Sequence, residues 1–190
     1  MTADKQQSHR RERQTRRPRK VTAERLRRIG LAYLERYEAS EAGFRAVLSR
    51  RVAKAAKAHE QDPSSFDGLI DEQVAWAKQA GLVDNTRFAA NQVRRQRDRG
   101  ASGRSIEARL RSKGLEASTI QAALADDRRD DASAADRYAE RRRLGPYRLR
   151  DRAERRDRDV AAMCRAGFSF DLARSVIDGA QEDGTGGDGV

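Results

Sequence analysis

The chain has 190 residues, with 41 basic and 30 acidic side chains and a formal net charge of +11. Leu, Ile, Val and Phe together make up about 16% of it, whereas fractions below roughly 20% approach the composition of disordered proteins. This composition excludes one large core and favours small units with thin cores. It also excludes a membrane span, because no run approaches the roughly 18 apolar residues required.

The cysteine and histidine content excludes further kinds of site. Cys164 is the only cysteine, so no internal disulfide can form. Together with His9 and His59 it supplies too few ligands for a zinc site. The basic N-terminus is not followed by the apolar segment of a secretory signal. We therefore expect a cytoplasmic protein without metal, cofactor or membrane contact.

The charge is distributed unevenly along the chain. Residues 1–20 have a net charge of +6 and almost no aliphatic side chains, which predicts a disordered basic arm. Residues 178–190 have a net charge of −4 and form a Gly-rich acidic tail. Within the body, residues 87–113 hold nine basic and two acidic groups, and such a positive surface attracts polyanions. Residues 126–159, with twelve basic and ten acidic groups, are typical of a solvated, salt-bridged helix pair.

The first predicted repeat, residues 21–80, contains three apolar stripes with helical spacing. Asp62 and Pro63 are suited to the start of the third stripe's helix, and Gly81 to its end. The stripes are Leu26, Ile29, Tyr33 and Tyr37; Phe44, Val47 and Leu48; and Phe66, Leu69, Ile70, Val74 and Ala77.

The second predicted repeat covers residues 81–126. Asp84 is suited to cap its first helix, with Val83 and Phe88 placed to form a hydrophobic staple. Ser102 is suited to begin the next helix and Gly114 to follow it. A third helix carries the last apolar residues of this repeat.

The third predicted repeat covers residues 127–177. Ser133 and Asp136 have the spacing of a capping box, which predicts that a helix begins at Ser133. Gly145 and Pro146 would end this helix, and Ser169 would cap the last one.

Internal echoes support three tandem units of three helices, an all-α fold of helix-turn-helix-like repeats in an elongated molecule. The pattern Ser-x3-apolar-x3-Leu-x2-basic occurs twice in the chain, and two shorter sequence patterns are also repeated. These echoes are Ser40 to Arg51 with Ser102 to Lys113, Arg87-Phe88-Ala89 with Arg137-Tyr138-Ala139, and Gly114-Leu115 with Gly167-Phe168.

No residue pattern indicates catalysis. Neither histidine has the neighbours of a general base, and the helical position of Cys164 predicts a buried structural thiol. The carboxylates mostly lie beside arginines, as solvated ion pairs do. Nucleotide-binding fingerprints are absent. The sequence therefore favours a binding protein over an enzyme.

Three segments resemble the RecX family, the regulators of the RecA recombinase. They are residues 81–89 (GLVDNTRFA), 99–115 and 162–174 (AMCRAGFSFDLAR). Residues 141–147 (RRRLGPY) look like members from alphaproteobacteria. The resemblance spans roughly residues 25–178. It departs from the family at Val52, where glycine is common, and at the long Ala-rich stretch 53–62.

The resemblance implies a curved, elongated monomer that binds along the groove of the RecA filament on single-stranded DNA. It further implies that filament extension, ATP hydrolysis, strand exchange and coprotease activity are restrained, so that DNA repair and the SOS response are modulated. The family has no catalytic residues to transfer. As the surface that contacts RecA or DNA, we predict the basic face of the second repeat, namely Arg94, Arg95, Arg97, Arg104, Arg109, Arg111 and Lys113.

Two other interpretations stay open. A helical module that binds DNA without RecA predicts tight binding that weakens steeply as salt rises. A structural adaptor predicts that function depends on the arm (1–20) or the tail (178–190).

Overall fold

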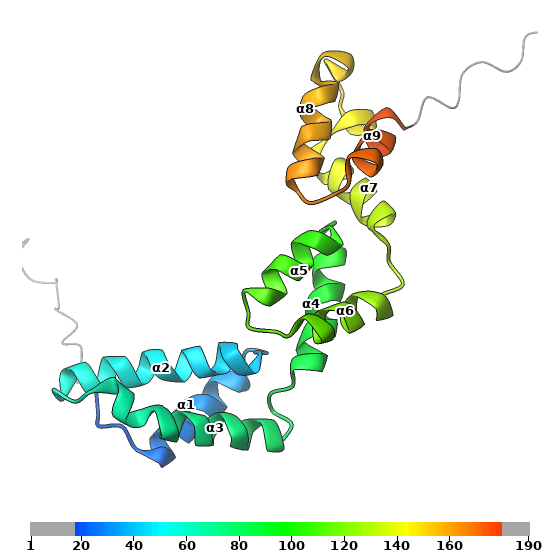
Figure 1. Cartoon of the computed structure of the whole chain (residues 1–190). Coiled ribbons are helices and arrows are strands. Elements are labelled where there is room, and N and C mark those ends of the chain that lie inside the picture. Colours follow the sequence, from blue (N-terminus) through cyan, green and yellow to red (C-terminus); the bar gives the residue numbers. More distant parts are fainter. Residues whose placement is uncertain (1–17, 180–190) are drawn as a thin grey trace, which may run out of the picture.

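The computed structural model describes residues 18–179, which form three three-helix units arranged one after another (Figure 1). Among these residues there are nine α-helices and no strands, so the predicted all-α fold of three units is confirmed. Apart from residues 18–20, the predicted arm lies outside the described residues, as does the tail after Gly179. Within residues 18–179, every helix is too short or too polar to span a membrane.

Each unit has its own helices and its own buried cluster. Unit 1 contains α1 (Ala23–Leu34), α2 (Glu41–Ala58) and α3 (Asp67–Gln79), the last preceded by a 3-10 turn (Pro63–Phe66). Unit 2 contains α4 (Asn85–Arg97), α5 (Gly103–Arg111) and α6 (Ala117–Asp126). Unit 3 contains α7 (Asp131–Arg142), a 3-10 turn (Gly145–Tyr147), α8 (Arg152–Arg165) and α9 (Phe170–Asp178).

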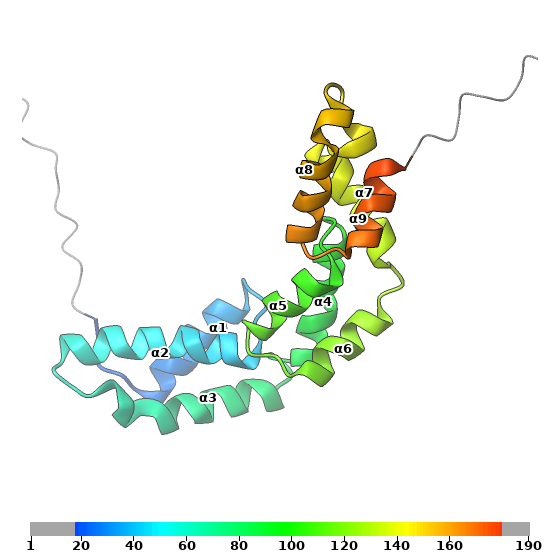
Figure 2. The ribbon, with the colours of Figure 1, turned by 45° about the horizontal axis from the view of Figure 1, so that its top comes forward.

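The units bury small cores, as the composition requires. Phe44, Leu48 and Ile70 are fully buried in unit 1, Ile106 and Leu110 in unit 2. The unit 3 core relies on several alanines and on Met163, beside which Cys164 is only half-buried. Because the units are joined end to end, the molecule is elongated and bends between its ends (Figure 2).

Most helix starts agree with the sequence analysis. The side chains of Asp84, Ser102 and Ser169 accept hydrogen bonds from backbone amides in the first turns of α4, α5 and α9. The predicted start at Ser133 is wrong: Asp130 caps α7 and accepts the Ser133 amide at 2.9 Å. Both residue types can cap a helix, and the earlier cap places Asp131 in the first turn, where it contacts unit 2.

Two other local expectations are corrected. The staple residues Val83 and Phe88 are both buried, but Val83 packs in the core of unit 1 and Phe88 in that of unit 2. Tyr37 was assigned to the inner stripe of the first helix but is 59% exposed. The reason is that α1 ends at Leu34, so helical spacing no longer applies at Tyr37.

The structural alignment of units 2 and 3 differs from the alignment that one repeated sequence pattern predicts. The capping residues Asp84 and Asp130 occupy the same position in α4 and α7, 46 residues apart. The echo of Arg87-Phe88-Ala89 at Arg137, 50 residues apart, is therefore not the structural correspondence.

Each pair of neighbouring units meets at a joint held by the same two hydrogen bonds. At the first joint, Ser40 Oγ donates to the Lys113 carbonyl at 2.7 Å, and the Glu41 amide donates to Asn85 Oδ1 at 2.9 Å. At the second joint, Ser102 Oγ donates to the Ala166 carbonyl at 2.8 Å, and the Gly103 amide donates to Asp131 Oδ1 at 2.8 Å.

The serine at each joint therefore has two roles. Ser40 and Ser102 each cap a helix of their own unit by accepting a backbone amide, and they donate the hydroxyl proton to the next unit. The acceptor carbonyl lies just before Gly114 or Gly167, both at positive φ. The serine and glycine echoes in the sequence thus mark the residues that join the units.

Candidate basic interface

The seven predicted basic residues lie on α4, on α5 and in the turn after α5, but they do not form one uniform face. Arg97 is 6% exposed and bonds to the Ala101 carbonyl and to Asp131, with Asp127 3.6 Å away. Its guanidinium belongs to the interior of the second joint, and its surface exposure was wrongly expected. The cause is tertiary: Asp131 at the start of α7 and Asp127 at the end of α6 both lie beside it.

Two more of the seven already have carboxylate partners. Arg95 lies 3.6 Å from Glu38 in unit 1, and Arg111 bonds to Glu107 one turn earlier at 2.6 Å. Both side chains are more than half exposed, so these pairs contribute little stability. They do, however, reduce the positive charge that each arginine presents.

The remaining four are exposed and have no carboxylate within 4 Å among the described residues: Arg94, Arg104, Arg109 and Lys113. Arg94 donates to the neutral side chain of Asn91. Arg109 donates to Gln96 Oε1 at 2.9 Å, which holds its guanidinium on the surface between α4 and α5. These four keep their full positive charge on unit 2.

Two clefts beside unit 2, one toward unit 1 and one toward unit 3, are both lined by Arg99 and Arg109. The first cleft, of about 460 Å³, lies between units 1 and 2 and also includes Lys113 and the carboxylate of Glu38. The second cleft, of about 470 Å³, lies between units 2 and 3. Basic side chains therefore continue from one joint of the molecule to the other.

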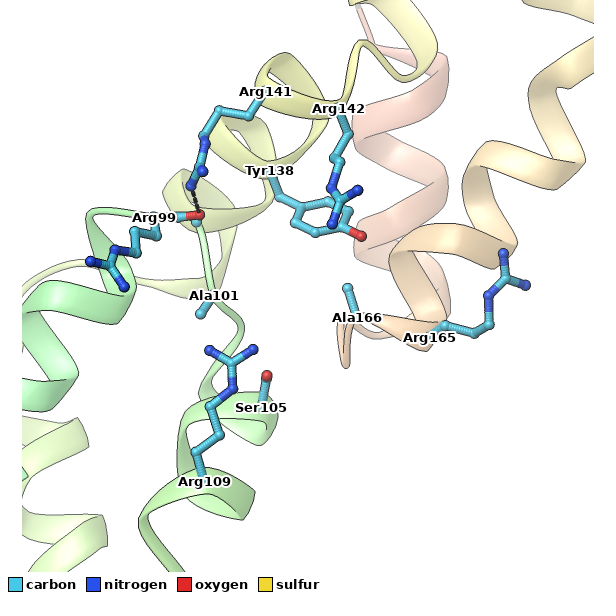
Figure 3. A pocket seen from close by; sticks show the side chains of 10 residues that line it. Arg99, Ala101, Ser105, Arg109, Tyr138, Arg141, Arg142, Arg165 and Ala166 are labelled. Carbon is cyan, nitrogen blue, oxygen red and sulfur yellow. Dashed lines mark hydrogen bonds between the residues drawn. The ribbon is translucent and has the colours of Figure 1, made fainter. Parts of the chain in front are cut away.

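The second cleft contains arginines that the sequence analysis did not select. Figure 3 shows Arg109 and Arg142 beside the middle of the cleft, Arg141 reaching to the Arg99 carbonyl, and Arg165 at the opposite edge. Arg99 belonged to the basic stretch but not to the predicted site. Arg141 and Arg142 lay in the segment interpreted as a solvated helix pair. Only the fold brings them together, and three consecutive arginines at 141–143 were the sole sequence signal.

Tyr138 lies centrally in this cleft. Its ring packs at 5.6 Å from that of Phe168 in the core of unit 3, and the Arg142 guanidinium lies 5.8 Å from the Tyr138 ring centre. The Arg141 side chain donates to the Arg99 carbonyl at 2.6 Å and so ties α7 to the turn after α4 (Figure 3). The cleft is thus built from both units, and its shape depends on how they are joined.

The carboxylates of unit 3 with a lowered pKa serve its structure. Burial raises the pKa of Asp159, but the hydrogen bonds from Arg148 and the Gly145 amide outweigh it and lower the pKa overall. A hydrogen bond from Arg156 lowers the pKa of Asp178. Among residues 18–179 no group of three or more His, Cys, Asp or Glu side chains is arranged to hold a metal ion. The chemical groups that the described surface offers are exposed arginine side chains, which are suited to bind anions.

Comparison with known proteins finds two relatives that have the same name. The chain is 37% identical over 171 residues to "Regulatory protein RecX" of Myxococcus xanthus, covering 88% of this chain and 91% of that protein. It is 29% identical over 152 residues to "Regulatory protein RecX" of Agrobacterium fabrum, with 80% of each covered. No family model matches the chain.

A solved structure has the same fold. "Crystal structure of regulatory protein RecX" superposes with a TM-score of 0.59 at 22% identity, covering 82% of this chain and 71% of that one.

Proposed function

The chain belongs to the RecX family of regulatory proteins, and we propose that it regulates RecA by binding the RecA filament on single-stranded DNA. Binding would limit filament extension and, with it, ATP hydrolysis, strand exchange and coprotease activity. DNA repair and the SOS response would be affected through these activities.

The observation that carries this proposal is the unpaired positive charge of unit 2 within an elongated molecule. Arg94, Arg104, Arg109 and Lys113 are exposed and have no carboxylate within 4 Å among the described residues. A filament with bound DNA offers acidic protein groups and phosphates along its length. A surface of this kind attracts such a partner and positions the chain on it.

The first test measures the single-stranded-DNA-dependent ATPase of RecA with this protein added below the RecA concentration. We expect ATP hydrolysis to fall at substoichiometric amounts, because one bound regulator blocks further extension. An equally basic, unrelated protein serves as the control and should not reproduce the fall. No effect, together with salt-sensitive binding to bare DNA, would instead support a DNA-binding module that acts without RecA.

The second test locates the interface. Reversing Arg94, Arg104 and Lys113 to glutamate together should raise the dissociation constant for the filament, since each removes a favourable charge and adds a repulsive one. The matched control reverses Arg28, Arg50 and Arg51, which are exposed basic residues on the helices of unit 1. Unchanged filament binding by the first variant removes this surface from the mechanism.

A further inference from the structure

The charged side chains that line the second cleft are all positive. Its ten lining residues include five arginines and no carboxylate: Arg99, Gly100, Ala101, Ser105, Arg109, Tyr138, Arg141, Arg142, Arg165 and Ala166. None of the five guanidiniums has a carboxylate within 4 Å among residues 18–179. Some arginines elsewhere, such as Arg45, Arg148 and Arg156, do have one.

Three carbonyl oxygens of the residues that line the cleft already accept hydrogen bonds. The carbonyl oxygens of Arg99, Ala101 and Ala166 accept hydrogen bonds from Arg141, Arg97 and Ser102. The lining therefore offers mainly donors: the five guanidiniums, with the hydroxyls of Ser105 and Tyr138 beside them. Arginine donors of this kind suit phosphate oxygens, which accept two parallel hydrogen bonds from one guanidinium.

The like charges also come from different units. Arg99 and Arg109 belong to unit 2, whereas Arg141, Arg142 and Arg165 belong to unit 3 (Figure 3). Arg109 and Arg142 reach toward the middle of the cleft, whereas Arg99 and Arg165 lie at its edges (Figure 3). An anion bound between the two units would reduce the repulsion between their positive charges. A ligand bound here would therefore hold units 2 and 3 together.

We propose that the second cleft binds a compact oligophosphate, such as the triphosphate group of a nucleotide, and that this ligand stabilises the joint between units 2 and 3. The volume of about 470 Å³ lies within the range of small-molecule sites. Tyr138 packs against Phe168 and Arg142, so its ring is not free to stack on a base. Recognition would therefore rest on the phosphates, with little preference for the base.

The phosphates of a single DNA strand share this chemistry, but the surface favours the compact form. A strand that continued from the second cleft into the first would pass Glu38, an acidic residue that lines the first cleft. The lining of the first cleft therefore contains a negative charge, whereas the lining of the second cleft contains none. This proposal does not depend on RecA binding.

Calorimetric titration of the full chain at constant ionic strength tests the proposal, with tripolyphosphate, ATP, AMP and a short oligothymidylate as probes. We expect tripolyphosphate and ATP to bind once per chain with similar affinity. AMP and the oligothymidylate should bind about tenfold more weakly or worse, since they place fewer charges in the cleft. Tripolyphosphate should also raise the melting temperature.

The variant Arg142→Gln with Arg165→Gln should weaken tripolyphosphate binding by about tenfold or more, because two charge-assisted contacts are lost. The variant with lysine at both positions keeps the charge and should lose less. The matched control, Arg50→Gln with Arg51→Gln, removes the same charge from exposed positions on α2 and should change affinity less than about twofold. Circular dichroism establishes that each variant is folded.

Two results would overturn the proposal. One is that tripolyphosphate does not bind, or that its affinity falls equally in the two glutamine variants. An equal fall would show that binding depends on net charge alone. The other is oligothymidylate binding that is tighter than tripolyphosphate binding and more sensitive to Arg142 and Arg165. In that case the cleft belongs to a surface for DNA strands. Neither result contradicts RecA regulation, which the ATPase assay tests separately.

Discussion

At the first joint Glu38 accepts a hydrogen bond from Asn91 and lies beside the exposed side chain of Arg95. At the second joint Arg97 is buried between Asp127 and Asp131. Both joints have the same serine and amide hydrogen bonds, so the difference lies in the charges added to them. At the second joint Arg97 and Asp127 are buried and Asp131 is partly exposed, and the charged side chains that line the cleft beside them are all positive. The first joint leaves its ion pair partly exposed and includes a carboxylate in its cleft.

This comparison shows that a repeated connection can be adapted by a few residues. The hydrogen bonds set where neighbouring units meet, and the charges set how much each joint contributes to stability and what it can bind. We therefore expect equivalent substitutions at the two joints to differ wherever they remove charge or close contacts, and to agree wherever they remove the shared hydrogen bonds.

The largest difference is expected for arginine. Arg97→Ala should lower the free energy of unfolding by about 2–4 kcal/mol, because the largely buried Asp127 keeps only Arg129 as a counter-charge and the Ala101 carbonyl loses its donor. Arg95→Ala should cost less than about 1 kcal/mol, because its side chain is 58% exposed. Urea denaturation of both variants measures this, and equal losses would contradict the contrast between buried and exposed pairs.

Replacement of a glycine at the second joint is expected to have the next largest effect on stability. Gly100 has φ +72°, and a Cβ there would lie 2.8 Å from the Tyr138 amide nitrogen and 2.9 Å from the Ala134 carbonyl oxygen. Gly100→Ala should therefore cost about 2–4 kcal/mol from backbone strain and crowding together. Gly81→Ala is the control, with φ +66° but open space around its Cβ. It should cost about 1–2 kcal/mol, and an equal cost at Gly100 would show that the joint relaxes.

The shared serines should behave alike. Ser40→Ala and Ser102→Ala each remove a helix cap and a hydrogen bond between units. Each should cost about 1–3 kcal/mol, and the two values should agree within about 0.5 kcal/mol because the geometry is the same. Thermal or urea unfolding provides the comparison. A clear disagreement would show that the neighbouring charges alter even the shared contacts.

The smallest effect is expected in the pH dependence of the unfolding free energy. Hydrogen bonds from Ser133, together with the Arg97 charge, lower the pKa of Asp130 below its ordinary value. Its contribution to stability is thus complete above the unfolded pKa of about 4 and is lost as the pH falls through the lower, folded value. Asp130→Asn retains a capping side chain without the titration. The unfolding free energy of this variant, followed from neutral to acidic pH, should fall less steeply than that of the native chain.

Much of the fold is readable from the sequence because it depends on local physics. Apolar spacing at three and four residues predicts the helices, and capping side chains such as Asp84, Ser102 and Ser169 give their starts. The low content of large aliphatic residues predicts several small cores. The serine and glycine echoes identify the repeats, since the same residue pair is needed at each joint.

The tertiary structure decided what local patterns leave open. The choice of Asp130 over Ser133 as the cap of α7 goes with the contact that Asp131 makes across the joint. Arg97 is on the basic stretch of the sequence, yet unit 3 buries it, whereas Arg141 and Arg142 come from a segment of balanced charge and line the second cleft. Whether a charged side chain is paired or free depends on groups far away in the chain, because electrostatic interactions act through space and not along the sequence.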